Sequence, residues 1–157
     1  MPALERILVP TDFSDTAEIA MTYGSELANA FQATLHLVNV IEDVTSTGGA
    51  RAGERHRPPP PPLIQPMEDQ AMQVLKMAVA KLQPQPSKAV LAIQEGSPFV
   101  EIVRYARKHA IDLIVIGTHG HGPVAHLLLG SVAENLVRQA PCPVMTIRHP
   151  AHTFVKP

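Results

Sequence analysis

The residues best suited to chemistry in this sequence form a glycine cluster near position 120. Three glycines fall within six residues, at Gly117, Gly120 and Gly122, and Gly130-Ser131 follows where an amphipathic segment begins. Glycine adopts positive φ readily, so successive N–H groups can turn inward as an anion-binding nest. A helix N-terminus adds unpaired N–H donors and a positive dipole end. The two parts together are typical of a polyphosphate site.

On the residues alone, a second explanation of this segment stays open. The glycines could serve tight turns, and Ser131 with Glu134 has the spacing of a helix capping box. Two better-known phosphate motifs are excluded. The GxGxxG pattern is absent, and a P-loop needs a lysine where none occurs between Lys108 and Lys156.

Three histidines, His119, His121 and His126, lie in the same stretch. No carboxylate or cysteine accompanies them there, and a glycine loop does not impose the tetrahedral geometry of zinc. The pattern therefore favours histidines that face phosphate or solvent over a metal site held by the protein.

Apolar runs and segments of helical period alternate along the chain. The runs are β-branched and nearly continuous, which is typical of strands in a sheet covered on both faces. They lie at residues 7–9, 35–40, 89–93, 113–116 and 144–147. The helical segments between them span residues 17–31, 71–82, 99–110 and 132–140. Ser14 or Asp15 is placed to cap the first helix and Ser97 the third.

The order βαβαβαβαβ predicts an α/β fold. Right-handed crossovers then give one five-stranded parallel sheet, doubly wound and Rossmann-like. In such open sheets, ligands bind outside the carboxyl ends of the strands, where the strand order reverses. We therefore expect Thr11-Asp12, Val40 and Gly117, which end or follow predicted strands, to lie at the site.

A length of 157 residues fits one domain, which we place at residues 1–150, with a tail at 151–157. Residues 42–66 interrupt the pattern with Gly48-Gly49, Gly53 and a run of five prolines at 58–62. We predict a flexible Gly/Pro-rich surface insert there. A polyproline II segment that docks on a partner is the alternative.

Composition excludes several classes of protein. The chain carries 13 basic and 14 acidic side chains, which offers no electrostatic footprint for nucleic acid or an anionic membrane. It shows no signal-peptide pattern and no apolar run long enough to form a transmembrane helix. The single cysteine, Cys142, excludes an intrachain disulfide and is expected to be a buried apolar residue rather than a reactive thiol. We expect a soluble, cytoplasmic protein.

One spacing resembles a known family signature. Gly117-x2-Gly120-x9-Gly130-Ser131 is similar to the G-2x-G-9x-G(S/T) motif of the ATP-binding branch of the universal stress protein family. Further segments match in the same order, at residues 7–14 (ILVPTDFS), 37–40 (LVNV), 96–98 (GSP), 112–117 (DLIVIG), 127–134 (LLLGSVAE) and 140–144 (APCPV). Only residues 43–66 and the tail after Arg148 fall outside the resemblance.

The resemblance implies an adenine-nucleotide site on a fold of the adenine nucleotide alpha hydrolase type. Asp12 would contact the ribose or the adenine region, and Val40 would meet the adenine edge through its backbone. The loop glycines would let the backbone approach the ribose and phosphates, and the helix start at Gly130-Ser131 would bind phosphate oxygens. The implied nucleotide-binding residues are Pro10, Thr11, Asp12, Val40, Ile116, Gly117, His119, Gly120, His121, Gly130, Ser131 and Val132.

The resemblance also implies a regulatory protein of the stress response, which acts through occupancy by ATP, ADP or AMP, with any Mg²⁺ carried by the nucleotide. A regulatory protein partner would fit that role. The family commonly forms homodimers by antiparallel pairing of the last strand. That strand is here Val144, Met145, Thr146, Ile147 and Arg148.

Two other functions stay open beside nucleotide-dependent regulation. One is a slow ATPase on the same site, although the loop has no arginine finger and no obvious base placed on a water. We expect at most weak hydrolysis and assign no catalytic residue. The other is a nucleotide-free interaction module, against which the intact glycine-serine motif argues.

Two departures from the family pattern concern charge. Many members carry arginine or lysine after the second glycine and another basic residue further on, where this chain has His121 and His126. Histidine is mostly neutral at pH 7 because its unperturbed pKa is about 6.5, so it neutralises a triphosphate poorly. We expect weaker nucleotide affinity than in the basic relatives, rising as the pH falls toward 6. The Gly/Pro-rich insert is a third departure, placed to alter access to the adenine end.

Overall fold

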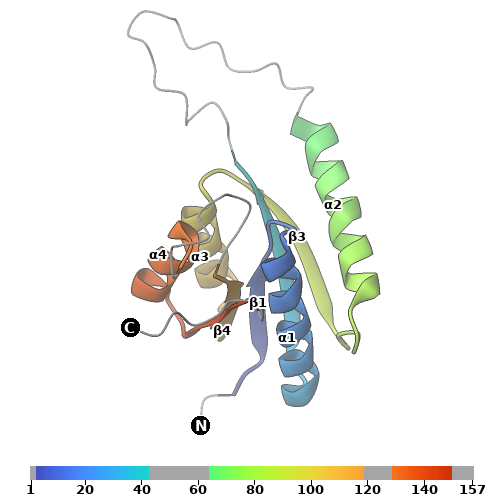
Figure 1. Ribbon diagram of the computed structural model, residues 1–157, viewed down its shortest axis with the longest axis vertical. Helices are drawn as coiled ribbons and strands as arrows, with labels where there is room; N and C mark the ends of the chain where they lie inside the picture. The colour runs from blue at the N-terminus through green and yellow to red at the C-terminus, as the bar shows by residue number, and fades with distance from the viewer. Residues whose placement is uncertain (1–2, 43–63, 119–128, 150–157) are drawn as a thin grey trace, which may run out of the picture.

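The computed structural model describes residues 3–42, 64–118 and 129–149, and the predicted α/β order is confirmed (Figure 1). The elements are β1 (Arg6–Pro10), α1 (Asp15–Phe31), β2 (Thr34–Ile41), α2 (Ile64–Lys81), β3 (Ala89–Glu95), α3 (Pro98–Lys108), β4 (Leu113–Gly117), α4 (Ser131–Gln139) and β5 (Val144–Ile147). All five strands are parallel and lie in the order β3-β2-β1-β4-β5.

The strand order reverses beside the central strand β1. The chain first builds outward from β1 to β2 and β3, and then returns to add β4 and β5 on the other side. Leu8 of β1 is therefore in register with His36 of β2 on one side and with Ile114 of β4 on the other. The reversal between β1 and β4 is the switch point at which open parallel sheets bind ligands.

Helices cover both faces of the sheet, which explains why the strands are continuously apolar. Ile7 and Val9 pack with α1 and α2 in one cluster, whereas Leu8 packs with α3 and α4 in the other. Figure 1 shows these two helix pairs on opposite sides of the strands. Two residues that the helical period placed on buried stripes, Phe31 and Val137, are 54% and 55% exposed. Phe31 is the last residue of α1, and Val137 lies on α4, which packs beside the edge strand β5.

Helices α1 and α3 begin after the predicted capping residues, and two details differ from the prediction. Ser14 caps α1, and its hydroxyl accepts from the Ala17 N–H at 3.3 Å. Ser97 caps α3 by position only, because its side chain makes no capping hydrogen bond. Helix α2 begins at Ile64, so residues 64–66 belong to the helix and not to the insert as predicted. Pro66 is tolerated there because first-turn N–H groups have no intrahelical acceptor.

The remainder of the predicted insert, residues 43–63, lies outside the described residues, as does the tail from residue 150. Within the described ranges, no helix is both long and apolar enough to cross a bilayer. Cys142 is half-buried against the cluster of α3 and α4, and burial raises the pKa of its thiol. Both observations agree with an apolar role for this cysteine.

Candidate functional site

The switch point brings together two of the segments that the sequence singled out. Because β1 and β4 are neighbouring parallel strands, their carboxyl ends lie side by side. Thr11-Asp12 follows the first and Gly117-Thr118 ends the second. Pro10 and Ile116 also lie there, but both are buried, so they can offer a ligand little beyond their backbone. Val40 is half-buried near the end of the adjacent strand β2.

A set of short-range hydrogen bonds shapes the turn after β1. The Thr11 hydroxyl accepts from the Phe13 N–H at 3.1 Å, and Oδ1 of Asp12 accepts from the Ser14 N–H at 3.0 Å. Phe13 has a φ of 62°, in the left-handed region that non-glycine residues rarely adopt. The turn thereby holds the exposed side chain of Asp12 just past the carboxyl end of β1 and directly before α1.

Gly117 has a structural reason that the sequence did not reveal. A Cβ at this position would lie 2.9 Å from both the carbonyl carbon and Cγ2 of Thr16, in the first turn of α1. The close packing of α1 on β4 therefore needs a residue without a side chain at Gly117. This glycine is required by the fold whether or not a nucleotide binds.

The start of α4 is tied back to the end of β4. The Gly130 N–H donates to the Thr118 carbonyl, and the Thr118 N–H donates to the Ile147 carbonyl of β5 at 2.9 Å. Thr118 is 1% exposed, and its backbone links the two halves of the motif. Thr118 and Gly130, which flank the middle of the motif, are thus hydrogen-bonded to each other at the carboxyl end of β4.

The helix start differs from the capping box that was one explanation of Ser131. Gly130 is the N-cap, so Ser131 is the first helical residue and its side chain is exposed. Glu134 instead pairs with Arg138 one turn later, at 2.9 Å. The capping-box explanation is wrong. The N–H groups of Ser131 and Val132 have no intrahelical acceptor and lie at the positive end of the helix dipole.

Several predicted site residues, namely His119, Gly120 and His121, lie outside the described residues together with His126. Their roles stay predictions. Among the residues that the structure does describe, no group of three or more His, Cys, Asp or Glu could hold a metal ion. That finding does not concern His119, His121 and His126, because they lie outside the described residues.

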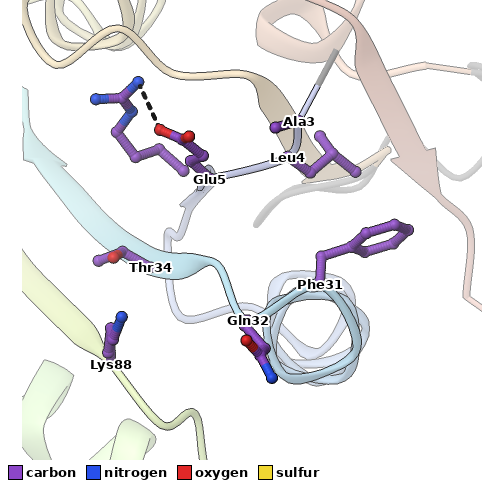
Figure 2. A pocket seen from close by; sticks show the side chains of 8 residues that line it. Ala3, Leu4, Glu5, Phe31, Gln32, Thr34 and Lys88 are labelled. Atoms are coloured by element: carbon purple, nitrogen blue, oxygen red, sulfur yellow. Dashed lines mark ion pairs between the residues drawn. The ribbon is translucent and has the colours of Figure 1, made fainter. Parts of the chain in front are cut away.

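A pocket on the described surface lies at the amino ends of the strands, opposite the switch point (Figure 2). It is lined by residues that precede β1, β2 and β3 or end α1, including Glu5, Phe31, Gln32 and Lys88. Glu5 there pairs with Arg6 at 3.5 Å. Ligands of open parallel sheets bind at the carboxyl ends of the strands, so this pocket at the amino ends is not the predicted site.

Sequence reasoning missed a buried aromatic group on the α3 face. His36 of β2 is 6% exposed, and its Nδ1 lies 2.9 Å from the Tyr105 hydroxyl. The Tyr105 ring stacks on His109, with 4.1 Å between the ring centroids. Burial, and then the charges of His109 and Arg6, lowers the pKa of His36. The sequence signal for this histidine is its position as a polar residue inside the apolar run 35–40.

Comparison with known proteins gives close relatives over nearly the whole chain. The profile of the Universal stress protein family matches residues 3–148. A universal stress protein of Methanocaldococcus jannaschii is 30% identical over 146 residues, covering 93% of this chain and 83% of that protein. The solved structure of the universal stress protein UspA from Lactobacillus plantarum has a TM-score of 0.76 at 28% identity, and the match covers 94% of this chain and 100% of that one. A universal stress protein from Archaeoglobus fulgidus, solved in complex with dAMP, has a TM-score of 0.63 at 22% identity, with 93% and 99% covered.

Proposed function

The chain belongs to the universal stress protein family, and we propose that it binds an adenine nucleotide at the switch point between β1 and β4. The observation that carries the proposal is the hydrogen bond from the Gly130 N–H to the Thr118 carbonyl. It holds the N-terminus of α4 beside the end of β4, one strand away from Asp12. N–H groups suited to phosphate oxygens and a carboxylate suited to ribose hydroxyls therefore lie at the same end of the strands. The dAMP complex of the Archaeoglobus relative supports the choice of an adenine nucleotide.

We assign a different part of the nucleotide to each part of the site. Asp12 and the backbone of Val40 take the adenosine, because they lie close to the carboxyl ends of the neighbouring strands β1 and β2. The N–H groups of Ser131 and Val132 take phosphate oxygens, because unpaired donors and a helix dipole attract anions. The loop residues 119–121 complete the phosphate side, and ATP with its own Mg²⁺, ADP and AMP are the candidate ligands.

Regulation by occupancy is the role we assign to this site. Bound nucleotide would change the surface offered to a protein partner beside Thr118 and Gly130, which a backbone hydrogen bond joins. Hydrolysis is the weaker alternative, because the loop sequence offers no arginine finger. An interaction module without nucleotide is the remaining one.

We further propose a homodimer through β5, which forms one edge of the sheet among the described strands. The carbonyls of Pro143 and Ile147 accept from Ile114 of β4 and from Thr118, which directly follows β4. The N–H and C=O groups of one strand residue point to the same side, so Val144 and Thr146 direct theirs outward. Such an edge invites pairing with another strand. Helix α4 packs beside β5 and leaves Val137 55% exposed, which a partner subunit would cover.

A matched pair of variants at Ser131 tests the phosphate assignment. Ser131→Pro deletes one N–H donor, and the helix tolerates it because proline is favoured at the first helical position. The Gly130 backbone, with φ −66° and ψ 156°, already has the conformation that a following proline requires. Ser131→Ala keeps the N–H and removes only the hydroxyl. We expect the proline variant to bind ATP about tenfold more weakly than the alanine variant, with equal thermal stability.

Native mass spectrometry of the freshly purified protein, followed by incubation with ATP and product analysis, separates the functions. Retained ATP supports regulation by occupancy, whereas bound ADP or AMP with steady turnover supports an enzyme. No bound nucleotide at millimolar ATP would leave the interaction module and would refute the proposal.

A further inference from the structure

Asn39 is a buried polar residue in an apolar row of β2. Leu35 and Leu37, which point to the same face of the strand, belong to the core under α1 and α2. Asn39 continues this row at the carboxyl edge and is 9% exposed. A buried side-chain amide is stable only where hydrogen bonds satisfy it. Its Nδ2 donates to the Thr11 carbonyl at 2.8 Å, so the side chain bridges β2 and the segment that leaves β1.

This bond holds Thr11 at both of its backbone groups. The Thr11 N–H donates to the Val38 carbonyl of β2 at 2.8 Å, and the Thr11 carbonyl accepts from Asn39. Thr11 is itself 5% exposed. Beyond it the chain turns at once, through Phe13 with its positive φ, into α1. The peptide that precedes Asp12 is therefore oriented by a side chain of the neighbouring strand.

We propose that Asn39 is a positioning residue of the nucleotide site, an inference that rests on the proposed function. Asn39 does not contact the ligand. Its side-chain amide fixes the Thr11 carbonyl, which orients the Asp12 carboxylate, and its own backbone leads directly to Val40. It thereby sets the spacing between the two groups that hold the adenosine, and the rest of the turn follows from the hydrogen bonds to Thr11 and Asp12.

The test compares Asn39→Leu with Ser25→Ala. The leucine keeps the number and branching of the side-chain heavy atoms of Asn39 and removes the donor, and Asn39→Ala is the second variant should the larger leucine prevent folding. Ser25 is the matched control because it is fully buried and its hydroxyl donates to a backbone carbonyl, that of Pro84, at 2.6 Å. That bond lies near the end of the sheet opposite the switch point.

Two measurements are made on each variant. Amide hydrogen exchange without nucleotide reports on the turn itself. We expect the N–H groups of Phe13 and Ser14 to lose about tenfold of their protection in the Asn39 variants and to keep it in Ser25→Ala. Calorimetric titration should show AMP and ATP affinity lowered by the same factor, about tenfold, since both ligands share the adenosine. Ser25→Ala should bind both nucleotides like the parent protein.

The outcomes separate this inference from the proposed function. Unchanged exchange at Phe13 and Ser14 overturns the positioning role, whatever the protein binds. Equal loss of affinity in Ser25→Ala overturns it as well, because the effect would then follow global stability. If the parent protein binds no nucleotide at millimolar concentration, the proposed function falls, and the exchange data still decide whether Asn39 holds the turn.

Discussion

Replacing Gly117 by alanine tests whether the first motif glycine serves the fold or the ligand directly. The added Cβ would lie 2.9 Å from the carbonyl carbon of Thr16 and 3.0 Å from its carbonyl oxygen. Carbon contacts are most favourable at about 3.5–4.0 Å, so α1 must move away from β4 by roughly half an ångström or more. Overpacking of this kind costs about 1–3 kcal/mol in the free energy of unfolding. The same loss lowers the melting temperature by about 2–4 °C per kcal/mol in a domain of this size.

The assay is urea unfolding followed by far-UV circular dichroism, because the chain contains no tryptophan to report by fluorescence. A double-mutant cycle with Thr16→Ser locates the clash. The serine removes Cγ2, which lies 2.9 Å from the added Cβ, and leaves the Thr16 backbone in place. We expect a coupling energy of about 0.5 kcal/mol or more, with partial recovery of stability in the double variant.

One result would refute this reasoning. If Gly117→Ala unfolds within about 0.5 kcal/mol of the parent protein but no longer binds ATP, then α1 has room for the methyl group. The glycine would then be kept for close approach of the nucleotide, as the family resemblance implied. A loss of stability with affinity retained at a temperature well below unfolding would confirm the packing role.

Three further predictions concern pH and assembly. Burial lowers the pKa of His36 below its unfolded value of about 6.5, so the unfolded chain binds the proton first and stability is lost as the pH falls below 6.5. His36→Gln should reduce the slope of unfolding free energy between pH 6.5 and 5 by up to about 1.4 kcal/mol per pH unit, and an unchanged slope in urea titrations would contradict this. Nucleotide affinity should rise from pH 8 to pH 6 as His121 gains charge, which titration of a labelled ATP analogue measures; equal affinities would refute it. Thr146→Pro should give a monomer in analytical ultracentrifugation with an unchanged circular dichroism spectrum, because the lost N–H faces away from β4, and a persistent dimer would exclude β5 as the interface.

Local patterns in the sequence were sufficient for the elements and their order. The strands are runs of β-branched residues and the helices carry apolar residues at helical period, and both properties are visible over a few neighbouring residues. The residues after the strands could be placed together because strands joined by crossover helices run parallel, and parallel strands have their carboxyl ends on the same side of the sheet. The predicted stripes failed at Phe31 and Val137, since helical period does not show which apolar positions a neighbouring element covers.

The positions of the candidate site residues in the fold were predicted in part, for a different physical reason at each residue, and their roles stay predictions. Asp12 and Gly130-Ser131 were found from their position at a strand end and at a helix start. Ser131 was also open to a capping role, and only the observed N-cap at Gly130 excludes it. Asn39 gave no local signal beyond being polar among apolar neighbours, because its partner, the Thr11 carbonyl, is 28 residues away in the chain.

The sequence by itself determined the class of fold and the family, and it predicted the residues of the candidate site, because periodicity and motif spacing are properties of the chain alone. The tertiary structure decided the strand order β3-β2-β1-β4-β5, and with it which strand ends meet at the switch point. It also decided why Gly117 has no side chain and what holds the turn at Asp12. Both depend on contacts between segments distant in sequence, Thr16 against Gly117 and Asn39 with Thr11, and such contacts exist only once the sheet has formed.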